Sequence, residues 1–202
     1  MVRRYYDKPL AAQGSNPFRC EGFLRDGAIP RQGGPDLPLA DLPPFLRALL
    51  VTDGTVTKTL EAYFWEPVEV QTLQQDLVPA ERPIDWIGVR PGDRVLIRRA
   101  RLRGTDSARV YASAFSVIRT ELIPEAFRRR LIDREIGIGV LIRDSGLESY
   151  REVLEVGLDQ SREGDDSEAP AGTELVLRTY RIIIERAPVI LITEGFPLPL
   201  FA

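Results

Sequence analysis

Hydrophobic residues change their spacing along this chain, and the change separates a helical segment from a longer strand-rich one. Between residues 41 and 63 the apolar positions recur every three to four residues, which predicts two short amphipathic helices. Asp41 is the expected N-cap of the first helix and Thr55 of the second. The sequence Thr52-Asp53-Gly54 predicts the break between them.

From Trp65 onward the apolar residues alternate with polar ones, and this period of two predicts β-strands. Val68 and Val70 alternate with polar neighbours, and Pro67 before them predicts the start of an edge strand. Further strands are predicted over residues 94–103, 109–119, 175–185 and 189–196, with short turns at 104–107 and 186–187. Short turns between neighbouring strands are typical of antiparallel hairpins.

The segments between these strands mix helix and loop signals. Residues 124–130 predict a basic helix. Residues 136–142 predict a short apolar segment within a loop, because Gly137 and Gly139 interrupt it. Residues 147–158 leave two interpretations open, since local propensity allows a helix and the pattern also fits a strand. The sum predicts an α+β domain, an antiparallel sheet with interspersed helices.

The length of 202 residues suits one domain with a short arm. Residues 1–37 are rich in Gly, Pro, Arg and Asp and show little periodicity, so they predict a partly irregular N-terminal arm. Residues 38–202 are the predicted domain. Within it, the acidic stretch 161–172 predicts an exposed loop.

The overall charge narrows the choice of partner. The net charge of -3 argues against general binding of nucleic acid, which needs a basic face, but it leaves room for a local basic pocket. No apolar run is long enough to span a bilayer, and the N-terminus lacks the apolar stretch of a signal peptide. The expected setting is cytoplasmic, and the expected partner is a small molecule.

Two residue types are nearly absent, and their absence excludes several kinds of site. The chain has no histidine, which excludes a Ser-His-Asp triad and a histidine-ligated metal. It has one cysteine, Cys20, which excludes an internal disulfide and a cysteine cluster. Any catalysis would therefore use carboxylates, arginine, lysine, tyrosine, hydroxyls or the backbone.

Strand parity places two charges on apolar faces. Side chains alternate across a strand, so Arg98 shares its face with Leu96 and Leu102, whereas Arg99, Arg101 and Arg103 lie on the opposite face. In the last predicted strand, Glu194 shares its face with Ile192 and is the one charge among apolar residues. A buried charge needs a partner, because desolvation of an unpaired ion is costly.

Two explanations account for these charges. Arg98 and Glu194 could pair with each other as a structural salt bridge. Alternatively they line a polar pocket and share a small anionic ligand, since the planar fork of arginine matches a carboxylate. The small residues Ala112, Ser113 and Ala114 on the neighbouring strand could leave room for a cavity, or could serve close packing.

Four segments, taken in order, resemble the chorismate pyruvate-lyase family. They are the helix–turn–helix signature Leu49–Lys58 followed by Leu60-Glu61, the arginine-bearing strand Arg94–Leu102, the glycine-containing flap Ile136–Ile142, and the Thr-Glu strand Pro188–Pro197. The match runs from about residue 38 to residue 201. It implies a single six-stranded antiparallel sheet with helical flaps over an internal site, in which residues 147–158 form a strand.

The resemblance also implies a reaction and a set of site residues. The reaction removes pyruvate from chorismate and leaves 4-hydroxybenzoate, with no metal or cofactor. Arg98 would bind the ring carboxylate, and Glu194 would lie near the ring oxygen as hydrogen-bond partner and proton donor. Val56, in the helix–turn–helix signature, and the backbone near Ile138 would contact the ligand. Lys58 and Arg178 are candidates for a second cation that meets the pyruvyl carboxylate, and either could instead be a surface charge.

Two other functions remain open at the level of sequence. The same fold is implied to serve as the effector-binding domain of bacterial repressors, so the chain could be a non-catalytic binder of an aromatic acid. It could also be a related enzyme of natural-product metabolism that uses the same pocket for another substrate. Either a monomer or a homodimer is compatible with the sequence.

Overall fold

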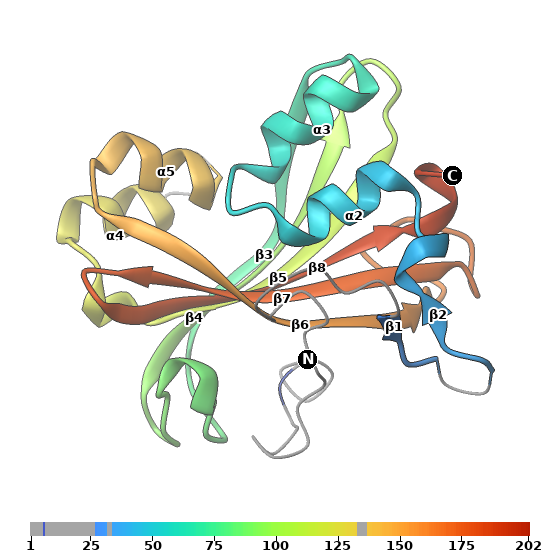
Figure 1. Ribbon diagram of the computed structural model, residues 1–202. Helices are drawn as coiled ribbons and strands as arrows, with labels where there is room; N and C mark the ends of the chain where they lie inside the picture. Colours follow the sequence, from blue (N-terminus) through green and yellow to red (C-terminus); the bar gives the residue numbers. More distant parts are fainter. Residues whose placement is uncertain (1–5, 7–26, 32–33, 133–136) are drawn as a thin grey trace.

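The computed structural model describes residue 6 and residues 27–31, 34–132 and 137–202, and its centre is one twisted sheet (Figure 1). Its strands are β3 (Val68–Pro79), β4 (Arg94–Gly104), β5 (Val110–Ile118), β6 (Ser149–Gln160), β7 (Glu174–Ile184) and β8 (Ala187–Pro197). They pair in the order β3-β4-β5-β8-β7-β6, and every pairing is antiparallel. The predicted α+β class with a six-stranded antiparallel sheet is confirmed.

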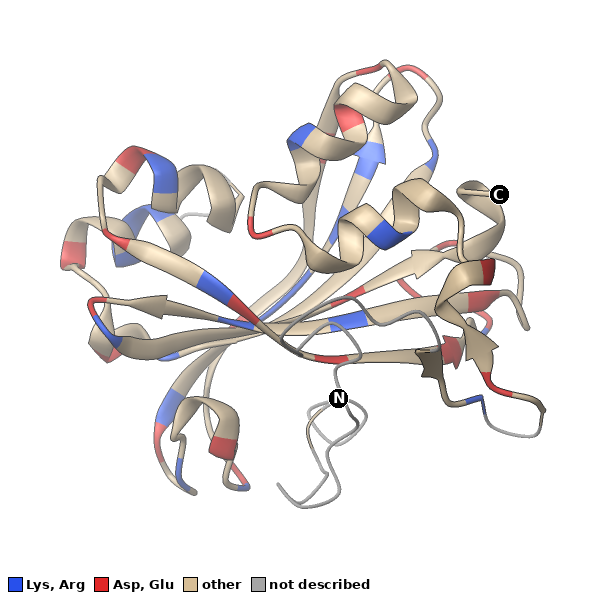
Figure 2. Ribbon diagram, in the orientation of Figure 1, with Lys and Arg blue, Asp and Glu red and all other residues tan. Residues whose placement is uncertain are grey.

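Four α-helices in the described residues cover one face of this sheet in two pairs (Figure 1). The first pair is α2 (Pro44–Val51) and α3 (Val56–Phe64), and the second is α4 (Glu125–Ile132) and α5 (Ile138–Ser145). We call the covered face the cavity face and the opposite one the outer face. Figure 2 shows that Lys and Arg occur on the strands as well as on the helices above them.

Each pair of helices closes its own apolar cluster on the cavity face. Leu46, Leu49 and Leu50 of α2 are fully buried against strand residues that include Leu102 and Phe196. At the other end of the sheet, residues of α4 and α5 pack with the apolar ends of β5, β7 and β8. Burial of these helical stripes is what holds such short helices in place.

Several local expectations are corrected by the structure. Asp41 does not cap the first helix: it ends a 3-10 turn, Leu39–Asp41, and Pro43 is the N-cap of α2. Thr55 does occupy the N-cap of α3, but its side chain makes no capping hydrogen bond. The predicted loop around residues 136–142 is a helix from Ile138, because Gly137 is its N-cap and the glycines lie at its start rather than in its interior. Residue 136 lies outside the described residues.

In the segment 147–158, for which helix and strand were both open, residues 149–158 belong to the edge strand β6, and residues 147–148 precede it. The hydrogen bonds of β6 to β7 outweigh the local preference for helix, as tertiary pairing commonly does. The start of β3 directly after Pro67, at the other edge, is also confirmed.

The predicted arm falls mostly outside the described residues, as does Cys20. Within the part that is described, Ala28–Ile29 (β1) pairs with Leu37–Pro38 (β2), and Ile29 is buried in the cluster beneath α2. Tyr6 lies on the outer face, where its hydroxyl donates a hydrogen bond to the carbonyl of Phe115.

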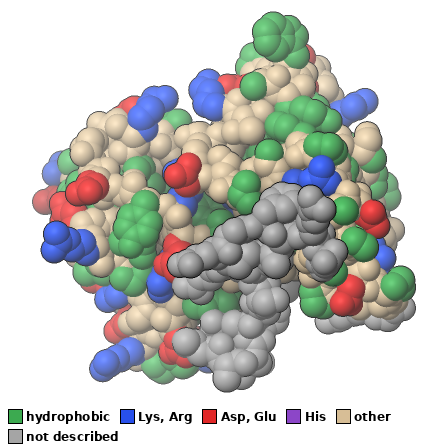
Figure 3. All heavy atoms as spheres, viewed as in Figure 1, with side chains coloured by type: hydrophobic (Ala, Val, Ile, Leu, Met, Phe, Trp, Pro, Cys, Tyr) green, Lys and Arg blue, Asp and Glu red, His purple; other side chains and the backbone are tan. Residues whose placement is uncertain are grey.

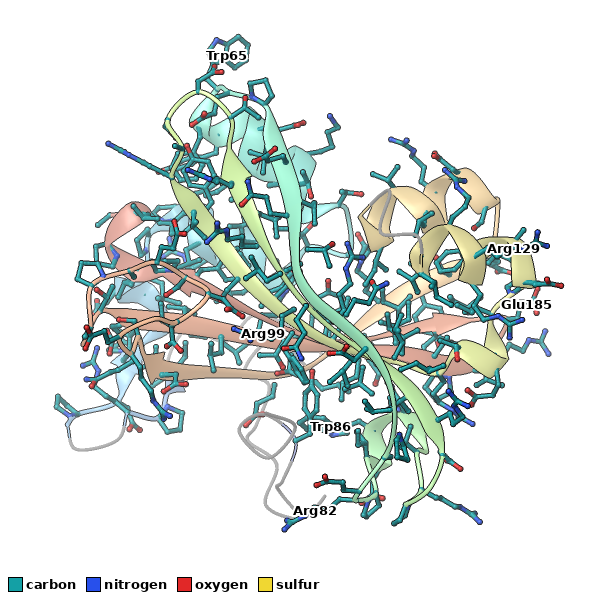
Figure 4. All side chains as sticks on the ribbon, turned by 180° about the vertical axis from the view of Figure 1, so that it is seen from behind. Trp65, Arg82, Trp86, Arg99, Arg129 and Glu185 are labelled. Carbon is teal, nitrogen blue, oxygen red and sulfur yellow. The ribbon has the colours of Figure 1, made fainter. Side chains whose placement is uncertain are left out.

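The acidic stretch 161–172 is the loop between β6 and β7, and it reaches across the outer face to β4. Asp166 accepts two hydrogen bonds from Arg99, and Glu168 pairs with Arg101. Figure 4 shows Arg99 near the middle of the sheet on this side and Trp65, which is 87% exposed, at the far tip beyond α3. Among the described residues, no helix is long and apolar enough to cross a membrane.

Candidate active site

A cavity of about 420 Å³ lies between the two helical pairs and has the sheet as its floor. Its walls come from the loop and first turn of α3, residues 54–58, and from the first turn of α5, residues 137–140. Its volume is in the range of ligand sites, which is roughly 300–1,000 Å³. Figure 3 shows acidic and basic side chains interspersed on the side of the molecule seen in Figure 1.

Arg98 lies on the cavity face of β4, as parity predicts, and is 3% exposed. Its guanidinium donates a hydrogen bond of 2.7 Å to the hydroxyl of Thr72 on the neighbouring edge strand. Ser116 is its partner across β5 and also lines the cavity.

Glu194 lies two strands away from Arg98, on the same face of β8, and is 5% exposed. Its carboxylate is held from behind by Arg178, whose guanidinium donates a hydrogen bond of 2.7 Å to Oε2. The structural salt bridge between Arg98 and Glu194 is therefore not formed. Ala114, the register partner of Glu194 on β5, separates the two charges with a minimal side chain.

Arg178 is fully buried and ties the carboxylate to the end of α2. Besides Glu194, its guanidinium bonds the carbonyl oxygens of Leu49, at 2.5 Å, and Thr52, at 2.9 Å. A cation at the carbonyl end of a helix also interacts favourably with the helix dipole. Burial lowers the pKa of Arg178, and the negative charge of Glu194 raises it. The net effect is a raised pKa, so the side chain stays a cation.

Tyr180 completes the surroundings of Glu194. Its hydroxyl donates a hydrogen bond of 3.1 Å to Oε1, and its ring lies 4.6 Å from the guanidinium carbon of Arg178. Burial, and next the charge of Glu194, raise the pKa of the phenol well above its usual range. Both carboxylate oxygens therefore accept hydrogen bonds from groups that keep their protons, and Glu194 presents acceptor lone pairs to the cavity.

The structure brings together five of the six residues named from the sequence. Arg98, Glu194, Val56, Lys58 and Ile138 all line the cavity. Arg178 does not, because it lies behind Glu194 with no exposed surface. Lys58 is at the rim, with a side chain that is 68% exposed and paired with Glu61.

Tyr180 and Arg151 are among the lining residues that were not named from the sequence. Tyr180 shares strand parity with Arg178, so the alternation in the segment 175–185 could have placed it on the cavity face. Arg151 lines the cavity from β6, and the helix–strand ambiguity of its segment hid which way it points.

The arrangement can hold an anion at one end and a polar oxygen at the other. The buried guanidinium of Arg98 suits a carboxylate, and the carboxylate of Glu194 suits a hydroxyl group that donates a hydrogen bond. Between them the floor is made of small and apolar side chains such as Ala100, Ala114 and Ile192. A flat ligand with an anionic and a hydroxyl end matches this pattern.

Comparison with known proteins relates most of the chain to chorismate pyruvate-lyases. The family model described as chorismate pyruvate-lyase Rv2949c-like matches residues 50–202. The chain is 30% identical over 153 residues to a chorismate pyruvate-lyase of Mycobacterium leprae, a match that covers 75% of this chain and 73% of that relative. It is 27% identical over 166 residues to a chorismate pyruvate-lyase of Mycobacterium tuberculosis, with 75% and 78% covered.

Solved structures share the fold at low sequence identity. The crystal structure of PhnF from Mycobacterium smegmatis superposes with a TM-score of 0.57 at 15% identity, over 73% of this chain and 65% of that chain. The effector domain of PhnF gives a TM-score of 0.54 at 16% identity, over 71% of this chain and 88% of that chain. At these identities the likeness concerns the fold alone.

Proposed function

Because the chain belongs to the chorismate pyruvate-lyase Rv2949c-like family, we propose that it removes pyruvate from chorismate and releases 4-hydroxybenzoate. The observation that carries this proposal is that Arg98 and Glu194, both almost fully buried, line one cavity whose floor between them is small and apolar. Chorismate presents a ring carboxylate for the first and a ring hydroxyl for the second.

The proposed reaction is an elimination whose driving force lies in the substrate. The ether bond between the ring and the enolpyruvyl group breaks, and the ring loses a proton as it becomes aromatic. The leaving group takes up a proton as it becomes pyruvate. The protein has to orient the substrate, exclude water and stabilise the charge that develops at the ether oxygen.

Each site residue has a role in this proposal. Arg98 binds the ring carboxylate and fixes the ring over Ala114. Glu194, held by Arg178 and Tyr180, accepts a hydrogen bond from the ring hydroxyl and lies beside the carbon that loses its proton. Because Arg178 and Tyr180 already hold the carboxylate in place, it does not have to reorient during the reaction. Such preorganisation of polar groups is the main source of electrostatic catalysis. Val56 and Ile138 close the cavity over the ring.

The test is incubation of the purified chain with chorismate, with pyruvate measured enzymatically and the aromatic acid by absorbance and mass. Pyruvate and 4-hydroxybenzoate in equal amounts are the expected result. The variant Arg98→Ala should lose turnover while it still unfolds cooperatively. Full turnover by that variant would remove Arg98 from the site.

The same assay separates the other functions. Calorimetric binding of 4-hydroxybenzoate without pyruvate release would identify a non-catalytic binder of aromatic acids. Failure of both measurements would point to a related enzyme with a different substrate in this pocket.

A further inference from the structure

Among the residues that the structure describes, four basic side chains line the cavity, and they differ in how their charge is balanced. Lys58 pairs with Glu61, and Arg143 pairs with Asp144 at 2.8 Å. Arg98 is the buried cation already assigned. Arg151 forms no ion pair with any described residue: its hydrogen bond goes to the backbone carbonyl of Asp53.

The guanidinium of Arg151 lies where the two helical walls approach each other. Asp53 belongs to the segment between α2 and α3, and a Cβ added at Gly139, in the first turn of α5, would lie 3.8 Å from Nη2 of Arg151. Arg151 thus reaches from the edge strand β6 to both walls. The start of α5 contributes partial positive charge of the same sign at this point.

Arg151 and Glu194 both line the cavity, from β6 and β8, with β7 between these two strands. The positive charge of Arg151 acts on the phenol of Tyr180 and lowers the pKa of that group, against the larger upward effects of burial and of Glu194. Tyr180 in turn bonds Glu194. Arg98, on β4, lies on the other side of Glu194 in the strand order, so the two arginines flank that carboxylate.

The chemistry of the proposed substrate calls for two cations. Chorismate carries one carboxylate on its ring and another on the enolpyruvyl group, and that group is attached to the ring carbon next to the hydroxyl. With the ring carboxylate at Arg98 and the hydroxyl at Glu194, the second carboxylate lies at the Glu194 end. An arginine without a carboxylate partner is suited to receive it.

We propose that Arg151 binds the carboxylate of the departing enolpyruvyl group, an inference that rests on the proposed function. Arg151 discriminates the substrate, which has two carboxylates, from the aromatic product, which has one. Once the ether bond breaks, the pyruvate enol keeps its contact with Arg151 at the rim while the aromatic acid stays at Arg98. The assignment replaces Lys58 and Arg178 as the second cation, since one is neutralised at the surface and the other lies outside the cavity.

The experiment compares Arg151→Gln and Arg151→Lys with the unmodified chain. Steady-state pyruvate release gives kcat and KM for chorismate, and calorimetry gives the Kd of 4-hydroxybenzoate. Arg151→Gln should lower kcat/KM for chorismate by about tenfold or more, the size of a lost hydrogen bond between charged groups. The Kd of 4-hydroxybenzoate should change by less than about twofold, and Arg151→Lys should recover part of the loss.

Arg129→Gln is the matched control, because it removes an exposed cation of α4 that Glu125 already balances and that does not line the cavity, and it should leave both measurements unchanged. Equal losses of chorismate turnover and 4-hydroxybenzoate binding in Arg151→Gln, or no loss of turnover, would overturn the inference while the proposed function stands. Absence of pyruvate release by the unmodified chain would overturn the proposed function and this inference with it. Retained 4-hydroxybenzoate binding shows that each variant is folded.

Discussion

Arg178 and Glu194 are register partners on β7 and β8, and they form a buried ion pair at 2.7 Å in which the arginine has no exposed surface. The same guanidinium holds two carbonyl oxygens at the end of α2. The side chain of Arg178 thus connects the carboxylate in the cavity to the end of α2, directly before the segment that forms one cavity wall. The pair has both a structural and a positioning role.

Loss of Arg178 should be costly for stability. Arg178→Met leaves a buried carboxylate without its cation, and breaking a buried pair in this way typically costs about 3–5 kcal/mol. The free energy of unfolding from urea titrations measures this. The control is Arg129→Met on α4, which breaks an exposed pair with Glu125 and should cost less than about 1 kcal/mol. Equal effects of the two variants would contradict the structural role of Arg178.

Tyr180→Phe should separate the hydrogen bond to Glu194 from the packing of the ring. The ring and its contact with Arg178 remain, so the loss of unfolding free energy at neutral pH should be about 1 kcal/mol. The raised pKa of Tyr180 favours the folded state below pH 10, the usual phenol pKa, and this contribution is lost as the pH rises further. The difference between parent and variant should therefore shrink in alkali. A difference that grows with pH would contradict the assignment.

Glu66 should give the chain part of its sensitivity to acid. A hydrogen bond from Tyr111, joined by bonds from the backbone of Ser107 and Asp106, lowers the pKa of Glu66 to about 2. A lowered folded-state pKa stabilises the protein above the unfolded value of 4.5, and this is lost as the pH falls toward 2. Glu66→Gln should lower the urea midpoint at pH 7 more than at pH 2.5. Tyr111→Phe should reproduce part of this pattern, and a midpoint loss independent of pH would exclude it.

Ala114→Leu should fill the cavity between Arg98 and Glu194 without unfolding the sheet. The added atoms enter empty space, so stability should change by less than about 1.5 kcal/mol. Binding of 4-hydroxybenzoate, measured by calorimetry, should be lost. Ala48→Leu makes the same substitution on the exposed side of α2 and should leave binding intact. Unchanged binding in Ala114→Leu would place the ligand elsewhere.

The inward direction of Arg98 and Glu194 could be predicted from sequence because alternation follows from the covalent geometry of a strand. The structure gives both side chains nearly complete burial. Strand pattern alone, however, left open whether they pair with each other. The answer depends on which residues face each other across strands, and sequence alternation carries no information about that register.

The Arg178–Glu194 pair could not be predicted because its register is set by an unusual turn. Glu185 and Arg186, which join β7 to β8, both have positive φ, at 49° and 68°, a geometry that hairpin turns more often achieve with Asn and Gly. A bulge between Ile182 and Ile183 then shifts the pairing once more. A slip of one residue would have placed Glu194 opposite a different side chain. Figure 4 shows Glu185 at the end of this hairpin.

The ion pairs of the acidic loop affect how a ligand reaches the cavity. β4 lies on one side of the central strands β5 and β8, and the β6–β7 loop starts from the other side. The ion pairs of Asp166 and Glu168 with Arg99 and Arg101 therefore connect the two halves of the sheet across its outer face. Spreading the strands would break both pairs. Moving the segment between α2 and α3 away from β6, by contrast, breaks the hydrogen bond of Arg151 to Asp53. We therefore expect the ligand to enter and leave the cavity between the two helical pairs, past Arg151.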